Sequence, residues 1–168
     1  MFVLGIDPGV SRCGYGCVTG SGNQLRTVAV GVIRTSPADP LPDRLAGLLA
    51  ELRALIAEIE PDAVVVERVF FQTNVRTAMS VGQASGLALA AAASAGCDVV
   101  QYTPNEVKQA VAGHGAAPKE QVQRMVQRLL KLAEPPRPPD AADALALAIC
   151  HLTRAPRAAR VAAAGRSR

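Results

Sequence analysis

The sequence is poor in aromatic residues and lacks the long apolar runs of membrane proteins. Aromatic residues make up only 3% of the chain, and tryptophan is absent. The most apolar run, 86–96, consists mostly of alanine and is too short to span a bilayer. No basic-then-apolar segment with a small-residue cleavage site opens the sequence. We therefore expect a cytoplasmic protein that does not associate with membranes.

Cysteine is also scarce. The four cysteines, Cys13, Cys17, Cys97 and Cys150, include no Cys-x-x-Cys pair and have no histidine at a spacing typical of zinc sites. This pattern excludes a disulfide framework and fits a reducing compartment. We expect Cys13 and Cys17 to be small buried thiols.

Length and charge divide the chain into two unequal parts. With 168 residues, of which 49% are hydrophobic, the chain is long enough for one domain with a buried core. Residues 154–168 contain five arginines and no acid, whereas residues 1–153 contain 13 basic and 14 acidic residues. We expect one domain over 1–153 and a basic, flexible tail over 154–168 that suits phosphate backbones. A solubilising tail without a specific partner is the alternative.

The hydrophobic pattern predicts strands and helices in an order typical of α/β proteins. Five strands are predicted at 3–7, 13–19, 27–35, 63–69 and 98–102. Helices are predicted at 45–59, 74–95, from Thr103-Pro104 onward, at 119–132 and at 140–152. Hairpins come first and crossovers later, which predicts a mixed five-stranded sheet flanked by helices.

Four carboxylates occupy unusual places in this pattern. Asp7 and Glu67 each end an apolar strand, and Asp140 and Asp143 share one face of the last helix. If the two strands are neighbours, all four side chains converge at one edge of the sheet. Oxygen donors without cysteine or histidine suit Mg²⁺ or Mn²⁺, and a pair of such ions can cleave a phosphodiester.

Each of these acids also has an ordinary explanation. Asp7 can begin an Asx-type turn, and Glu67 can pair with the adjacent Arg68 or with a more distant arginine. Asp140 can cap the last helix, with Asp143 as a charged residue in its first turn. The occurrence of three such sites in one strand order is what favours the metal site.

Two further segments allow a functional and a structural interpretation. Phe70 and Phe71 follow Glu67 closely, and an aromatic side chain at the edge of a site can stack on bases or wedge between them. Both phenylalanines can equally belong to the core. The helix predicted at 74–95 is rich in alanine, glycine and serine, which suits either a homodimer contact or packing on the sheet.

Five short motifs, in this order and spacing, resemble the RuvC family of bacterial Holliday-junction endonucleases. They are LGIDPG at 4–9, VERVF at 66–70, GQASG at 82–86, VKQ at 107–109 and DAADALA at 140–146. The resemblance extends from residue 2 to about residue 152. It implies a ribonuclease-H-like fold over 1–153 and a two-fold homodimer that nicks opposed strands of a four-way DNA junction during recombination and repair. It also implies two Mg²⁺ ions per active site, which Mn²⁺ can replace, and cooperation with the RuvA–RuvB branch-migration complex.

The resemblance also assigns roles to individual residues. Asp7, Glu67, Asp140 and Asp143 match the metal-binding catalytic acids of the family. Lys119 matches a basic residue near the cleaved strand and is expected to take part in catalysis. The residues that the resemblance assigns to DNA binding are Phe70, Arg76, Lys108 and Lys119.

Two alternatives come from other classes of protein. The segment Gly5-Ile6-Asp7-Pro8-Gly9 also resembles the phosphate loop of actin-like sugar and acetate kinases, but those enzymes need two such domains around the nucleotide. The second alternative is a non-catalytic DNA-binding module or a diverged relative such as the YqgF group. The presence of all four acids together with Phe70 and both lysines favours the nuclease.

Overall fold

The chain forms five strands and five helices within the described residues, in the predicted order. The computed structural model describes residues 1–22, 24–68 and 75–165, and their side chains except those of 21, 75–77 and 156–165. The strands are β1 (Phe2–Asp7), β2 (Arg12–Ser21), β3 (Gln24–Arg34), β4 (Ala63–Glu67) and β5 (Asp98–Tyr102). The helices are α1 (Leu41–Ile59), α2 (Val75–Ser94), α3 (Pro104–Ala112), α4 (Lys119–Leu129) and α5 (Pro139–Gly165).

The sheet is mixed and has the strand order β3-β2-β1-β4-β5. Strands β1, β2 and β3 form an antiparallel meander, whereas β4 and β5 run parallel to β1. Ile6 pairs with Val66 in the register of β1 and β4, so Asp7 and Glu67 end neighbouring parallel strands. The predicted mixed five-stranded sheet is confirmed, and it places two of the candidate acids at one sheet edge.

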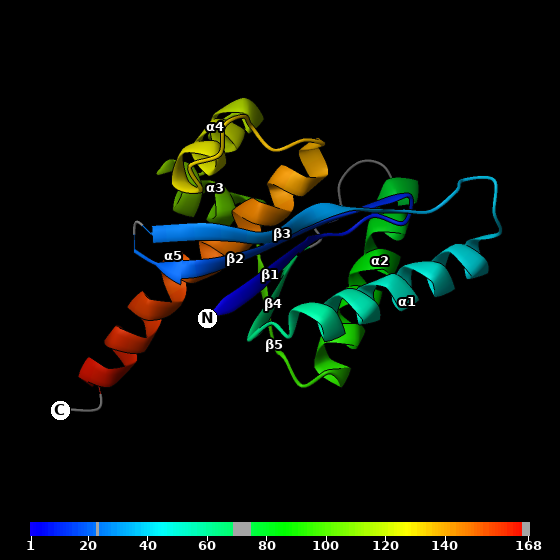
Figure 1. Ribbon diagram of the computed structural model, residues 1–168, viewed down its shortest axis with the longest axis horizontal. Coiled ribbons are helices and arrows are strands. Elements are labelled where there is room, and N and C mark those ends of the chain that lie inside the picture. Colours follow the sequence, from blue (N-terminus) through cyan, green and yellow to red (C-terminus); the bar gives the residue numbers. More distant parts are fainter. Residues whose placement is uncertain (23, 69–74, 166–168) are drawn as a thin grey trace.

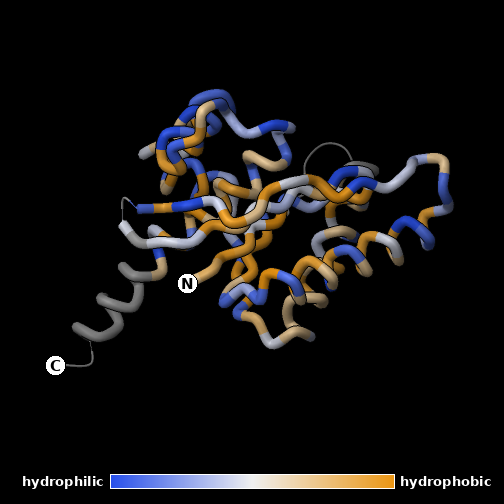
Figure 2. The backbone as a smooth tube through the Cα atoms, in the orientation of Figure 1, coloured by the Kyte–Doolittle hydropathy of each residue, from blue (hydrophilic) through white to orange (hydrophobic). Residues whose placement is uncertain are grey.

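Helices cover both faces of this sheet (Figure 1). Successive side chains of a strand point to opposite faces. Leu4 of β1 therefore packs with Leu52 in the core beneath α1 and α2, whereas Val3 packs with Ile149 in the core beneath α3, α4 and α5. Figure 2 shows the hydrophobic residues gathered in the central strands, with hydrophilic residues frequent in α4 and on the outer side of α1. Each fully buried Leu or Ile contributes roughly 1.5–3 kcal/mol relative to an exposed one.

Three glycines bring α5 unusually close to the sheet. Gly5 of β1 pairs with Gly16 of β2, and Gly14 pairs with Asp7 two residues further along. A Cβ atom on Gly5 would lie 2.0 Å from the backbone oxygen of Ala144, and one on Gly14 would lie 2.1 Å from that of Asp140. Any side chain at these positions would push α5 away from the strands. The glycines thus determine how closely the first turns of α5 approach the strands β1 and β2.

Two helix ends differ from the prediction. Helix α5 does not stop near Leu152 but continues to Gly165, through a segment rich in alanine and arginine, which are good helix formers. Arg154 is anchored to the domain, because it pairs with Glu106 at 3.3 Å and lies 5.3 Å from the ring centroid of Tyr102. Helix α4 ends at Leu129 rather than near residue 132, since Lys131 adopts a positive φ of 54°. The division into a domain over 1–153 and a flexible tail over 154–168 stays a prediction.

Small side chains also explain how α2 packs. Ala84, Ala88, Ala91 and Ala92 are buried against the sheet and α1, so packing on the sheet uses one face of this helix. Met79, on the same helix, is 61% exposed. No helix among the described residues is both long and apolar enough to cross a membrane.

Candidate active site

The four candidate acids converge in one cleft of about 400 Å³. The cleft lies at the carboxyl ends of β1 and β4, beneath the first turn of α5 and between α3 and α4. Its charged lining residues are Asp7, Glu67, Lys108, Lys119, Asp140 and Asp143. The structure therefore brings together all four acids and both lysines that the sequence singled out.

Local sequence explains how each acid reaches the cleft. Asp7 and Glu67 follow directly on buried strand residues, so the backbone carries their carboxylates to the sheet edge. Asp140 and Asp143 are three residues apart in the first turns of α5 and share its inner face. Gly14 admits the backbone of Asp140 to within contact distance of β2. All four side chains are half-buried.

Burial and repulsion from neighbouring carboxylates disfavour the ionised forms of Asp7, Glu67 and Asp143. Burial, followed by repulsion from Asp143, Glu67 and Asp140, raises the pKa of Asp7 to about 8, although Lys119 opposes this shift. Burial and the charge of Asp143 also raise the pKa of Glu67. The pKa of Asp143 is raised by burial despite its hydrogen bond to Lys119. A cation that enters the cleft would therefore stabilise the ionised carboxylates.

Two basic side chains already pair with the acids of α5. The Nζ of Lys119, the first residue of α4, donates a hydrogen bond of 2.6 Å to Oδ2 of Asp143. Burial alone would lower the pKa of Lys119, but that bond and the nearby carboxylates outweigh it and raise the pKa. Arg12, at the start of β2, donates from its guanidinium to Oδ2 of Asp140 at 2.5 Å.

Arg12 was missed by the sequence interpretation. Its contact with Asp140 joins residues 128 positions apart, and no local sequence pattern predicts such a pair. The only available signal was its position five residues after Asp7, in the segment that leaves the carboxyl end of β1. A basic residue there lies at the same sheet edge as the acids.

The ordinary explanations for the acids find little support in this geometry. Asp7 is the last residue of β1 rather than part of the following turn, and Asp140 is the second residue of α5 rather than the residue before it. Arg68 uses its backbone N–H to bond the carbonyl of Tyr102. No ion pair joins Glu67 to an arginine in the part of the chain that the structure describes.

The carboxylates of the cleft are the type of ligand that hard divalent cations prefer, although they are not arranged around a single metal position. Carboxylate oxygens are the protein ligands that Mg²⁺ and Mn²⁺ prefer, and the cleft offers four of these groups without a thiolate or imidazole. Among the residues that the structure describes, no three acidic, histidine or cysteine side chains are grouped closely enough to hold an ion. Asp140 and Asp143 are instead paired with Arg12 and Lys119.

The remaining DNA-binding candidates are only partly described. Phe70 lies outside the described residues, and so does the side chain of Arg76, whose backbone belongs to α2. Lys108 of α3 is half-buried and lines the cleft. Cys13 and Cys17 are buried thiols, as predicted, and burial raises the pKa of Cys13 to about 12. These thiols are therefore protonated at neutral pH and carry no charge beside the acids.

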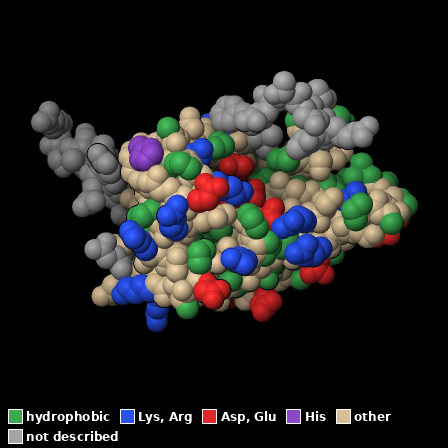
Figure 3. Space-filling model, turned by 90° about the horizontal axis from the view of Figure 1, so that it is seen from above, with side chains coloured by type: hydrophobic (Ala, Val, Ile, Leu, Met, Phe, Trp, Pro, Cys, Tyr) green, Lys and Arg blue, Asp and Glu red, His purple; other side chains and the backbone are tan. Residues whose placement is uncertain are grey.

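Basic side chains surround the acidic cleft at the surface. Figure 3 shows the face on which α3 and α4 lie, where Asp and Glu side chains are flanked by several Lys and Arg side chains. On the outer side of α4, Arg124 and Arg128 line a hollow of about 500 Å³ together with Glu120. This distribution suits a polyanionic ligand that crosses the cleft.

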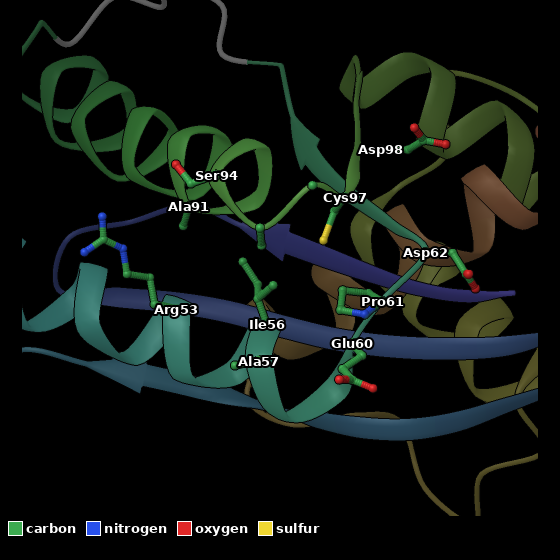
Figure 4. Close-up of a pocket in the computed structure, with 12 residues that line it drawn as sticks. Arg53, Ile56, Ala57, Glu60, Pro61, Asp62, Ala91, Ser94, Cys97 and Asp98 are labelled. Carbon is green, nitrogen blue, oxygen red and sulfur yellow. The ribbon is translucent and has the colours of Figure 1, made fainter.

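A larger cavity of about 820 Å³ lies at the opposite end of the sheet, next to the start of β4 and β5. Figure 4 shows Cys97 directed into it, while the charged groups of Arg53, Glu60, Asp62 and Asp98 lie apart from one another. No ion pair connects these four side chains among the described residues. The cavity lacks the convergent charges that distinguish the carboxylate cleft.

The sequence matches known proteins over nearly its full length. The family model described as Crossover junction endodeoxyribonuclease RuvC matches residues 3–151. A protein of that name from Salinispora arenicola is 58% identical over 165 residues, covering 98% of this chain and 94% of its own. Another of that name, from Moorella thermoacetica, is 53% identical over 156 residues and covers 93% of each chain.

Solved structures agree with these matches. The structure of Thermus thermophilus RuvC in complex with Holliday junction substrate superposes with a TM-score of 0.88 at 43% identity, covering 92% of this chain and 94% of that one. The yeast mitochondrial Holliday junction resolvase Ydc2 has a TM-score of 0.66 at 15% identity, covering 90% of this chain and 77% of that one. The latter likeness concerns the fold alone.

Proposed function

The chain belongs to the RuvC family of crossover junction endodeoxyribonucleases, and from this premise we propose how its cleft works. It is a nuclease that resolves four-way (Holliday) DNA junctions by hydrolysing phosphodiester bonds. The observation that carries the mechanism is the convergence of four carboxylates and two lysines at one edge of a ribonuclease-H-like sheet. The match of residues 3–151 to the RuvC family model favours the nuclease over the actin-like kinase and the YqgF-like module.

The proposed catalytic acids are Asp7, Glu67, Asp140 and Asp143, which would hold two Mg²⁺ ions, replaceable by Mn²⁺. Such a pair supplies an activated water and stabilises the leaving oxygen of the cleaved strand. The raised pKa of Asp7 supports this role, because a buried carboxylate without a matching cation is an incomplete site. The acids hold their positions through β1, β4 and α5 rather than through mobile loops.

Lys119 is the proposed cation that acts on the scissile phosphate. Its ammonium contacts Asp143 and its side chain is more than half exposed, so Lys119 would lie at the opening of the cleft where a phosphate arrives. A fixed positive charge there stabilises the negative charge that develops on the phosphate during hydrolysis. Lys108, on the α3 side of the cleft, would hold the neighbouring part of the same strand.

Selectivity for junctions is proposed to come from Phe70, Arg76 and a homodimer. Phe70 follows Glu67 by three residues, which suits an aromatic side chain that holds unstacked bases beside the acids. Two subunits joined through α2 would nick the two opposed strands, and small residues on α2 suit such a contact. Cooperation with RuvA–RuvB in a cytoplasmic setting completes the proposal.

Cleavage of a synthetic four-way junction tests it. Wild-type protein should nick the junction in the presence of Mg²⁺ and leave a linear duplex of the same sequence intact. Asp7→Asn, Glu67→Gln and Asp143→Asn should each lose nicking while retaining junction binding, because phosphate contacts come from other side chains. Asp39→Asn, an exposed loop position, is the matched control and should behave as wild type.

The outcomes separate the parts of the proposal. Nicking by wild type in EDTA would contradict the metal mechanism, and nicking by Asp143→Asn at the wild-type rate would remove that residue from it. Equal cleavage of junction and duplex would contradict junction selectivity while leaving the nuclease assignment intact.

A further inference from the structure

Arg12 lies against a carboxylate of the cleft but does not line it. Its guanidinium donates to Oδ2 of Asp140 at 2.5 Å, and its side chain is 45% exposed against 28% for Asp140. The cleft itself is lined by Lys108 and Lys119 as its basic residues. Arg12 therefore contacts Asp140 from the rim, with open solvent on its other side.

Hydrogen bonds fix the backbone just before Arg12, whereas its side chain is 45% exposed and, within the described residues, is held only by Asp140. Arg44 donates to Ser11 Oγ and to Thr35 Oγ1, and the N–H of Thr35 donates to the carbonyl of Ser11 at 3.2 Å. Thr35 Oγ1 in turn donates to the carbonyl of Val10 at 2.6 Å. These bonds hold the segment just before β2 against the end of β3.

Two features direct Arg12 toward Asp140 in particular. Arg12 and Gly14 are two residues apart on one strand and share a face, so the glycine that admits Asp140 lies next to the arginine that binds its carboxylate. Across the strand pair, Arg12 lies opposite Arg34. Repulsion between the two like charges disfavours conformations in which the Arg12 side chain lies beside Arg34. Contact with Asp140 relieves both this repulsion and that among the carboxylates.

We propose that Arg12 is an exchangeable counterion of Asp140, which it holds in the metal-free enzyme and must release before a divalent cation can use that carboxylate. This inference rests on the proposed function, because it takes Asp140 as a metal ligand. Arg12 is a positioning residue: it acts through Asp140 and sets how tightly the site binds metal. Its exposed side chain has solvent to move into when a cation displaces it.

Titration of the protein with Mn²⁺ in the absence of DNA tests the inference. The concentration of free Mn²⁺ is measured by electron paramagnetic resonance. Arg12→Gln should bind Mn²⁺ about two- to fivefold more tightly than wild type, on the scale of a half-exposed ion pair. Arg12→Lys keeps the charge but loses the planar guanidinium, so its Mn²⁺ affinity should lie between those of wild type and Arg12→Gln. Arg53→Gln, which removes the same charge at the far end of the sheet, should bind Mn²⁺ as wild type does.

A double mutant separates a direct contact from a general effect of charge. In Asp140→Asn the change Arg12→Gln should no longer alter Mn²⁺ affinity, because the partner of the guanidinium is gone. Melting in EDTA should show Arg12→Gln less stable than wild type, and saturating Mn²⁺ should remove that difference. Weaker or unchanged Mn²⁺ binding by Arg12→Gln would overturn the inference.

Failure of the inference is distinguishable from failure of the proposed function. Junction cleavage by wild type tests the function alone, at saturating Mg²⁺, where the Arg12 contact has been displaced. If wild type cleaves and Arg12→Gln shows no change in Mn²⁺ affinity, the counterion role is wrong and the nuclease assignment stands. If wild type binds Mn²⁺ in this manner but cleaves no junction, the function is wrong.

Discussion

The approach of α5 to Gly5 offers a quantitative test of how the site is assembled. In Gly5→Ala the new Cβ would lie 2.0 Å from the backbone oxygen of Ala144 and 3.0 Å from the backbone nitrogen of Ala148. Ordinary contact begins at 3.4 Å, so the helix must retreat by about 1.4 Å or the strand must bend. Neither neighbouring atom belongs to a flexible side chain that can rotate away.

The expected loss of stability follows from this overlap. Overpacking of a close-packed core costs typically about 1–3 kcal/mol, and a clash with rigid backbone places Gly5→Ala near the upper end. For a chain of this size, about 3 kcal/mol corresponds to a fall of roughly 6–12 °C in Tm. Gly47→Ala is the matched control, since Gly47 lies in α1 with nothing within 4 Å of the new Cβ. That variant should gain about 0.5–1 kcal/mol, so the two changes have opposite signs.

The same shift should damage catalysis more than folding. Asp140 and Asp143 ride on α5, whereas Asp7 and Glu67 are fixed to strands, so a retreat of α5 opens the carboxylate cluster. A displacement of about 1 Å in a catalytic site can cost about a hundredfold in rate. Junction nicking should be measured at a temperature where circular dichroism shows the variant fully folded. A Gly5→Ala protein with wild-type Tm and wild-type nicking would refute this account of the glycine contact.

Four further predictions concern the cleft and the DNA-binding segments. Lys119→Ala should lower the nicking rate, measured in single turnover, far more than it lowers junction affinity. Because the folded protein keeps a proton on Asp7 up to about pH 8 while the unfolded chain releases it near 3.8, metal-free protein should lose stability as pH rises between these values. Asp7→Asn should flatten that decline in a series of melts. Phe70→Ala should nick an intact junction poorly and be partly rescued by a junction with unpaired bases at its centre; a variant that only loses stability would show a core residue instead. Deletion of 156–168 keeps Arg154 and should weaken junction binding and flatten its salt dependence, by about 0.9 per lost phosphate contact; an unchanged slope would show that this segment does not touch DNA.

Much of the site could be predicted because its acids interrupt strong local patterns. Asp7 and Glu67 follow apolar runs that predict buried strands, and an acid at such a place needs compensation. Asp140 and Asp143 follow a proline-rich segment at helical spacing, which places them on one face. The strand order then brings Asp7 and Glu67 to one edge of the sheet, since β1 and β4 are parallel neighbours. Each step depends on short-range sequence or on the preference for right-handed crossovers.

Other features depend on distant contacts that no local pattern encodes. The ion pair between Arg12 and Asp140 forms only once α5 has packed on β2, and the close contact of α5 with Gly5 forms only once α5 has packed on β1. The helix end near Leu152 was wrong because the arginines beyond it suggested a solvated tail. Arg154 instead contacts Glu106 and Tyr102, and alanine sustains the helix to Gly165.

In the proposed mechanism, the charges of the cleft would make metal binding an exchange rather than a simple addition. At neutral pH the raised pKa of Asp7 keeps a proton on that carboxyl, Lys119 neutralises Asp143, and Arg12 neutralises Asp140. A divalent cation must displace this proton and these contacts, so part of its attraction to the carboxylates is spent on removing partners already present. The net affinity is lower than four free carboxylates would give. A DNA phosphate at the cleft would supply further oxygen ligands and would also receive Lys119, so we expect substrate and metal to favour each other's binding.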